Sequence, residues 1–177
     1  MKNNGFTIVE LVLIVAIIST LLGIAMFSFN YWSRKIKVKD FVFELASEIN
    51  YARDLARREG KRVILVILKP GSNNQDWTGN NNIDPICYFI FEDDNKNGVY
   101  DSGEKIITYN KCKGVEITTN QLMRDYGTDG KSLVFFPVGL PLVGDSDKTI
   151  TFCSKSNNHI SYSIKIHSIT GIGEIVQ

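Results

Sequence analysis

Hydrophobic and polar positions change their pattern twice along this chain. Residues 11–29 carry no charged side chain, and an apolar helix of about 20 residues is what a hydrocarbon core of about 30 Å requires. Residues 31–58 then place apolar side chains at helical spacing among charged ones. From residue 61 onward, short runs of β-branched and aromatic residues alternate with turn residues. The pattern predicts a membrane-spanning helix, an amphipathic helix and a β-rich domain, in that order.

The second segment continues the first without a helix breaker, because residues 31–58 contain neither proline nor glycine. Its apolar stripe recurs every three or four residues: Phe41, Leu45, Ile49, Ala52 and Leu55. Gly60 is a suitable terminator. We therefore predict one helix of about 50 residues. Its first part, about 20 residues, would span a membrane, and the rest would pack on a sheet.

Eight β-type runs follow, and Asn, Gly and Asp mark a long surface loop at residues 71–84. The predicted strands are residues 62–68, 86–91, 105–109, 115–119, 133–136, 149–153, 160–166 and 172–176. We expect a mostly antiparallel sheet laid on the helix. The fold class is therefore α+β, with a membrane stem.

Glu10 interrupts the apolar pattern just before the uncharged run. A carboxylate costs about 2.5–3.5 kcal/mol at the middle of a bilayer, so such a residue is a candidate functional site. A buried carboxylate also needs a cationic partner. A cleaved secretory signal has a shorter apolar region of about 7–15 residues. An ordinary single-pass anchor explains the length of the run but not the arrangement of Gly5, Phe6, Thr7 and Glu10.

This N-terminal arrangement resembles the class III signal of type IV pilins and type II secretion pseudopilins. The chain has a short leader with Lys2, then Gly5, Phe6 and Thr7, then Glu10 and the apolar run. The resemblance implies that a prepilin peptidase cuts after Gly5 and methylates Phe6, the new N-terminus. It also implies that Glu10 pairs with the terminal amine of a neighbouring subunit. The regions are then residues 1–5 leader, 6–29 span, 30–60 amphipathic continuation and 61–177 β-rich domain.

Four further stretches resemble the H-type minor pseudopilins and related minor pilins, the GspH/FimT family. They are ARDLARREGKRV, FIFEDDNKNGVYDSGEKI, LVFFPVGL and ITFC. The resemblance implies a minor pseudopilin of a type II secretion system, which helps to export folded proteins across the outer membrane. The alternative is a minor type IV pilin acting in pilus assembly, adhesion or DNA uptake. Members commonly end in a Gly-Arg strand, whereas residues 170–174 here read TGIGE, so nucleic acid is not an expected partner.

The implied location is the inner membrane, crossed once, with residues 61–177 in the periplasm and other pilins or pseudopilins as filament partners. Counting positive charges alone favours the opposite orientation. Lys2 precedes the span, while Arg34, Lys35, Lys37 and Lys39 follow it. We place the domain in the periplasm because both the prepilin pattern and the cysteines favour export.

Charge and histidine content exclude several function classes. The formal net charge is +1, which points to neither nucleic acid nor an acidic-ligand site. His159 and His167 are the only histidines, and neither lies in a nucleophile or metal motif. We expect no enzyme activity and no small-molecule substrate.

Three cysteines, Cys87, Cys112 and Cys153, show no C-x-x-C spacing. If residues 93–104 form a hairpin loop, antiparallel pairing brings Cys87 close to Cys112, within the Cα separation of about 4.4–6.8 Å that a disulfide requires. Cys153 would then be a buried thiol. A Cys112–Cys153 bond stays open as an alternative, because a strand register slips easily by one residue.

Residues 93–104 also fit the calcium-loop pattern D-x-[DN]-x-[DN]-G-x5-E. The pattern assigns the ligands to Asp93, Asn95, Asn97, Val99 (through its carbonyl), Asp101 and Glu104. Gly98 would allow the sharp turn. The flanking runs are predicted strands rather than the helices of an EF-hand, and Asn/Gly-rich hairpin loops are common without metal. Calcium is thus the one cofactor that the sequence suggests.

Overall fold

The computed structural model describes residues 7–68, 86–112, 114–122, 124–126, 130–142 and 144–176. Residues 71–84, expected to form a surface loop, lie outside them. The contacts divide the chain into two compact units, Met1–Ile36 and Lys37–Gln177. The elements are α1 (Ile8–Glu59), β1 (Val63–Leu68), β2 (Ile86–Glu92), β3 (Ile106–Lys111), β4 (Val115–Asn120), β5 (Arg124–Tyr126), β6 (Gly130–Phe135), β7 (Lys148–Ser154), β8 (Asn157–Ile166) and β9 (Gly173–Val176).

Helix α1 has 52 residues, which confirms the prediction of one long helix. In the first unit the hydroxyl side chains of Ser19 and Thr20 bond to the helix itself. Ser19 Oγ donates to the Val15 carbonyl at 2.7 Å and Thr20 Oγ1 to the Ile17 carbonyl at 2.8 Å. These polar groups are therefore satisfied within the segment, as a hydrocarbon environment requires. The helix ends before Gly60, whose φ of 65° lies in the left-handed region.

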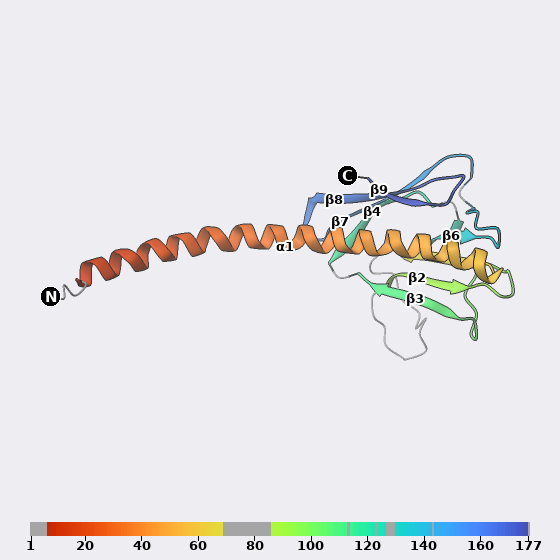
Figure 1. The fold of residues 1–177 in the computed structure, drawn as a ribbon, viewed down its shortest axis with the longest axis horizontal. Coiled ribbons are helices and arrows are strands. Elements are labelled where there is room, and N and C mark those ends of the chain that lie inside the picture. Colours follow the sequence, from red (N-terminus) through yellow and green to blue (C-terminus); the bar gives the residue numbers. More distant parts are fainter. Residues whose placement is uncertain are drawn as a thin grey trace. The chain divides into compact units, whose positions relative to one another are not determined.

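The β-strands of the second unit form two antiparallel sheets (Figure 1). The first has five strands in the order β3-β2-β1-β6-β5, and the second has four in the order β4-β7-β8-β9. The α+β class and the antiparallel pairing are confirmed, and the strands divide between two sheets rather than forming a single one. The chain leaves the first sheet after β3, turns at Gly114 with a φ of 79°, and β4 pairs with β7 instead.

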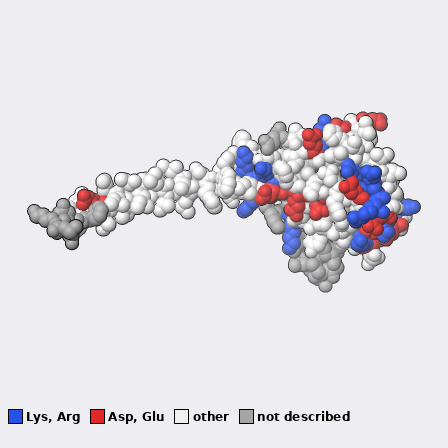
Figure 2. All heavy atoms as spheres, viewed as in Figure 1, with Lys and Arg blue, Asp and Glu red and all other residues white. Residues whose placement is uncertain are grey.

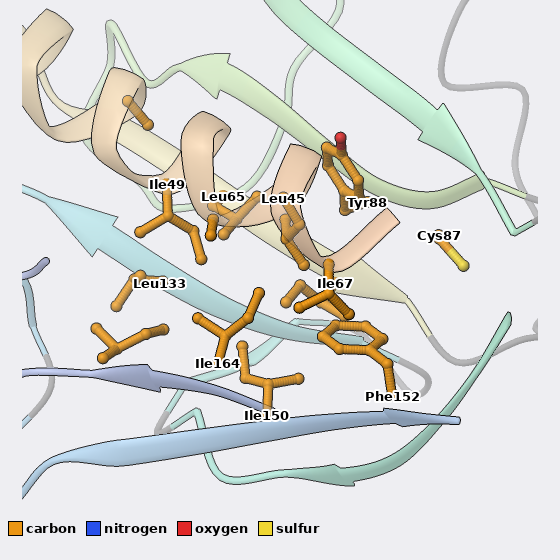
Figure 3. Packing of buried hydrophobic residues seen from close by; sticks show 14 of the residues in the cluster. Leu45, Ile49, Leu65, Ile67, Cys87, Tyr88, Leu133, Ile150, Phe152 and Ile164 are labelled. Carbon is orange, nitrogen blue, oxygen red and sulfur yellow. The ribbon is translucent and has the colours of Figure 1, made fainter. Parts of the chain in front are cut away.

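The second half of α1 lies between these sheets, with β8 and β9 drawn above it and β2 and β3 below it in Figure 1. Its predicted stripe is buried in full: Phe41, Leu45, Ile49, Ala52 and Leu55. Figure 3 shows Leu45 and Ile49 close to side chains of both sheets, among them Leu65, Ile67, Leu133, Ile150, Phe152 and Ile164. The Phe41 ring lies 5.4 Å from that of Phe152 and 5.8 Å from that of Tyr88, edge to face in both cases. One core thus joins helix and sheets.

Strand β1 is the centre of the first sheet and is buried along its whole length. Val63, Leu65 and Ile67 contribute to the core shared with α1, while Ile64 and Val66 belong to a second cluster with aromatic residues of β2. Burial on both faces explains why this strand is continuously apolar rather than alternating.

Candidate functional sites

The first unit presents a helical surface that carries no charged side chain from Leu11 to Phe29. Figure 2 shows this slender segment white along most of its length, whereas acidic and basic side chains gather over the β-rich unit. Its large apolar side chains are exposed in the isolated chain. Within the described residues, α1 is the one helix long and apolar enough to cross a membrane. A surface of this kind is stable only when lipid or other apolar helices cover it.

Glu10 closes the N-terminus of α1 together with Thr7. One Glu10 carboxylate oxygen accepts hydrogen bonds from the Thr7 backbone N–H at 2.9 Å and the Thr7 hydroxyl at 3.0 Å. The Thr7 hydroxyl in turn accepts the Glu10 backbone N–H at 3.3 Å. This is a capping box, and its Thr-x-x-Glu spacing is a local signal in the sequence. Gly5 and Phe6 lie outside the described residues.

Two ion pairs to one buried carboxylate lie beside the loop between β2 and β3. Glu92, at the end of β2, is buried and binds Lys61 Nζ at 2.6 Å and Lys105 Nζ at 2.9 Å. Burial of the Glu92 carboxylate raises its pKa, but the hydrogen bonds from the two lysines lower it more, so the pKa lies below its ordinary value. Both ends of the loop are therefore tied to one carboxylate.

Inside the loop, a dense network uses most of the expected ligand side chains. Asp93 Oδ2 accepts the Gly98 backbone N–H at 3.1 Å. Asn95 Nδ2 and Asn97 Nδ2 both donate to Asp101 Oδ2 at 2.6 Å. The loop places these side chains together around one short turn.

The remaining expected ligands lie in the second half of the loop. The two Glu104 oxygens accept backbone N–H groups of Asp94 and Asp101 at 3.1 and 3.0 Å. The Val99 N–H donates to Asn97 Oδ1 at 2.7 Å. Among the described residues, no group of three or more His, Cys, Asp or Glu side chains is placed to hold a metal ion. Any cation here would need the amide and carbonyl oxygens as well as the carboxylates.

Arg62 is a loop contact that sequence reasoning missed. Its Nη1 lies 3.4 Å from Asp93 Oδ2 and donates to the Lys96 carbonyl at 2.7 Å. The Tyr126 hydroxyl is a second one, because it accepts the Tyr100 N–H at 2.9 Å from a different strand. Neither contact has a local sequence signal, since each joins residues far apart in the chain.

Cys87 and Cys112 form a disulfide with a Cα separation of 4.9 Å. The pairing of β2 with β3 shifts register between Ile86 and Tyr88, which leaves Cys87 at the bulge, opposite the end of β3. Cys153 lies in β7 as a buried thiol and accepts a hydrogen bond from Thr118 Oγ1 at 3.1 Å. The two cysteines are 25 residues apart in the sequence. A cross-link that closes a loop of this length restricts the unfolded chain and stabilises the fold by about 3 kcal/mol.

His159 lies near the start of β8, and His167 directly follows its end. His159 is an exposed residue of β8. His167 has its Nε2 at 3.1 Å from Glu174 Oε2 and its Nδ1 at 3.4 Å from Asp147 Oδ2. The Ser168 backbone N–H and Lys165 both donate to the Asp147 carboxylate, and they lower its pKa to about 2. Charged hydrogen bonds here tie the segment before β7 to the end of β8.

The Asp147→Asn variant is expected to lose less stability than the wild type as the pH falls. The folded-state pKa of about 2 lies below the ordinary 3.8, so this carboxylate stabilises the fold above that ordinary pKa. The contribution disappears as pH falls through about 2. Melting temperatures of the full chain in detergent micelles, measured between about pH 2 and 7, should differ from wild type at neutral pH and converge at the acid end. Asp145→Asn is the matched control, because Asp145 is exposed. Parallel curves for wild type and Asp147→Asn would contradict the prediction.

Comparison with known proteins gives one family match. The model of the family described as "Type II transport protein GspH" matches residues 43–170, from the second half of α1 to the turn after β8. No curated protein matches the chain. Two crystal structures of the type IV minor pilin FimU from Pseudomonas aeruginosa (strain PAO1), in space groups P21 and P65, are similar in structure. Each has 13% identity and a TM-score of 0.49, with 82% and 79% of this chain and 92% and 93% of those chains covered.

Proposed function

The chain belongs to the GspH family, and from this premise we propose that it is a minor pseudopilin of a type II secretion system. In this role it is a structural subunit of the pseudopilus, the filament that helps to move folded proteins across the outer membrane. The family match over residues 43–170 carries the proposal. The uncharged helical surface of the first unit supports it, because filament subunits of this kind need an apolar helix that passes from lipid into the filament core. The role is structural and involves no catalysis.

The proposed location is the inner membrane, crossed once by the first half of α1, with the β-rich unit in the periplasm. The Cys87–Cys112 disulfide supports this orientation, because disulfides persist in oxidising compartments such as the periplasm. The basic residues after the span favour the opposite orientation by charge count. Export as a prepilin would override that count.

In this role the chain is cut after Gly5 by a prepilin peptidase and methylated on Phe6. Its partners are other pseudopilins, packed side by side through their apolar helices. Glu10 then faces the terminal amine of a neighbour, and the pairing of opposite charges in an apolar surrounding sets the axial position of each subunit.

A minor type IV pilin, acting in pilus assembly, adhesion or DNA uptake, is the second candidate. The Gly5-Phe6-Thr7 and Glu10 arrangement is common to both filament types and supports both equally. A role in DNA uptake has less support, because residues 170–174 lack the arginines of the competence branch.

Deletion of the gene in its host is the experiment that separates these roles. If the proposal is correct, secreted enzymes accumulate in the periplasm, surface pili and twitching motility stay normal, and the wild-type gene in trans restores secretion. Loss of pili with normal secretion would establish the second candidate instead. If neither secretion nor piliation changes, both roles are rejected.

A further inference from the structure

We propose that the loop of residues 93–104, between β2 and β3, binds one calcium ion. The ligands are the side chains of Asp93, Asn95, Asn97, Asp101 and Glu104 and the carbonyl of Val99. This is a metal site on the β-rich unit, and it is independent of the filament role proposed above.

The spacing of oxygen-bearing residues is the first support. Carboxylate or amide side chains occupy positions 1, 3, 5, 9 and 12 of a twelve-residue loop, and glycine occupies position 6. That glycine, Gly98, has a φ of 83°, which a side chain at this position would oppose. The chain therefore makes the sharp turn that brings the two halves of such a loop around one centre.

The second and independent support is a buried carboxylate oxygen without a partner. The Asp93 side chain is completely buried, and within the described part of the chain its Oδ1 accepts no hydrogen bond. Its other oxygen, Oδ2, accepts the Gly98 N–H, so the carboxylate lies against the loop backbone. A buried, unsatisfied carboxylate oxygen is costly. A cation bound at Oδ1 removes that cost.

Arg62 does not meet this need. Its Nη1 lies 3.4 Å from Asp93 Oδ2 rather than Oδ1, and it already donates to the Lys96 carbonyl. Its Nε is also buried and has no hydrogen-bond partner among the described residues. The guanidinium therefore stabilises one oxygen of Asp93 and leaves the other for a ligand.

Amide groups from the first half of the loop and a carboxylate from the second half already converge on one point. Two amide nitrogens, from Asn95 and Asn97, lie 2.6 Å from Asp101 Oδ2. Rotation about the last side-chain bond exchanges the nitrogen and oxygen of an Asn amide. The same three side chains would then present oxygens to a cation. The cation would take the place of the two amide N–H groups that now donate to Asp101.

Glu104 is held in place for two-oxygen coordination. Backbone N–H groups from the two halves of the loop, those of Asp94 and Asp101, donate to its two oxygens. The hydrogen bond from the Tyr100 N–H to Tyr126 and the ion pairs of Glu92 fix the surrounding backbone. A flexible set of six or more oxygens suits Ca²⁺ rather than Mg²⁺, which requires near-octahedral geometry and keeps its waters.

Calorimetric titration of the full chain in detergent micelles tests this proposal, with CaCl2 and MgCl2 as the two ligands. After removal of bound metal by a chelator, calcium is expected to bind at one site with a Kd of about 10⁻⁴–10⁻³ M, the range of extracellular calcium modules. Calcium at about 10 mM, well above that Kd, should also raise the melting temperature. Magnesium should bind more weakly.

Three substitutions locate the site. Asp101→Asn and Glu104→Gln each remove one ligand charge and should weaken calcium binding by about tenfold or more. Asp94→Asn is the matched control, because it makes the same charge change at position 2 of the loop, where no ligand is expected. It should leave the Kd within about twofold. A melting curve without calcium shows whether each variant is folded. If Glu104→Gln does not fold, Asp101→Asn decides the test.

The proposal is overturned by the absence of binding heat and of any melting shift at these calcium concentrations. It is also overturned if Asp94→Asn weakens binding as much as Asp101→Asn does, since calcium would then respond only to the general negative charge of the loop.

Discussion

Replacement of Glu10 by glutamine is expected to exclude the chain from the filament while it remains processed and anchored in the membrane. The proposed partner of Glu10 is the terminal amine of a neighbouring subunit, and breaking a buried charge pair costs about 3–5 kcal/mol. That cost weakens subunit association by more than about a hundredfold. Glutamine preserves the capping box with Thr7, so the substitution removes the charge without removing the helix cap.

Thr7→Val is the matched opposite change, because it removes the capping hydroxyl and keeps the carboxylate. It should assemble. Assembly is measured by immunoblotting of sheared filament fractions, and processing by the mass of the N-terminal peptide, which should be N-methyl-Phe6. Normal assembly of Glu10→Gln would contradict the charge pairing. An intact Met1 on mature, membrane-extracted protein would contradict the processing step on which the pairing depends.

The substitution Phe152→Ala is expected to lower the free energy of unfolding by about 3–5 kcal/mol. The Phe152 ring is fully buried and meets Phe41 of α1 edge to face at 5.4 Å, as Figure 3 illustrates for its surroundings in the core. Truncation therefore opens a cavity at the contact between α1 and the second sheet. Since whole domains are stable by only about 5–15 kcal/mol, such a variant is close to unfolding.

Denaturant unfolding of the full chain in detergent micelles, followed by near-ultraviolet circular dichroism, measures this change. Ile169→Ala is the control, because the Ile169 side chain is 79% exposed. It should alter the free energy of unfolding by no more than about 0.5 kcal/mol. A similar effect of the two substitutions would show that Phe152 does not join the helix to the sheet as described.

Local patterns in the sequence were enough to predict α1 and most strands. The stripe from Phe41 to Leu55 and the stop at Gly60 depend only on neighbouring residues, and both are confirmed. The division into two sheets depends on which strands pair, and no local pattern encodes the choice of β7 rather than β3 as a partner for β4. Strand β5 was missed because it has three residues, too few to show a period.

The candidate sites also combine features that are local in the sequence with features that arise only from the fold. The twelve-residue spacing of the loop is a sequence property and was visible at once. The buried oxygen of Asp93 and its contact with Arg62 arise only when β1 and β2 lie side by side. The two cysteine pairings could not be separated by sequence, because the bulge between Ile86 and Tyr88 that sets their approach has no sequence mark of its own.

Because β1 lies at the centre of its sheet, its strand pairing can be completed only late in synthesis. Val63 pairs with Glu92 on one side and with Phe135 on the other, so β1 stays incomplete until residues far along the chain have been synthesised. Such non-local pairing closes slowly, because each long loop loses entropy before its contacts form. At about 5–20 residues per second, the apolar N-terminal segment leaves the ribosome seconds before β6 does. In the proposed periplasmic orientation, the export machinery therefore meets this helix on a chain whose β-domain is still unfolded, the state in which a chain can be translocated.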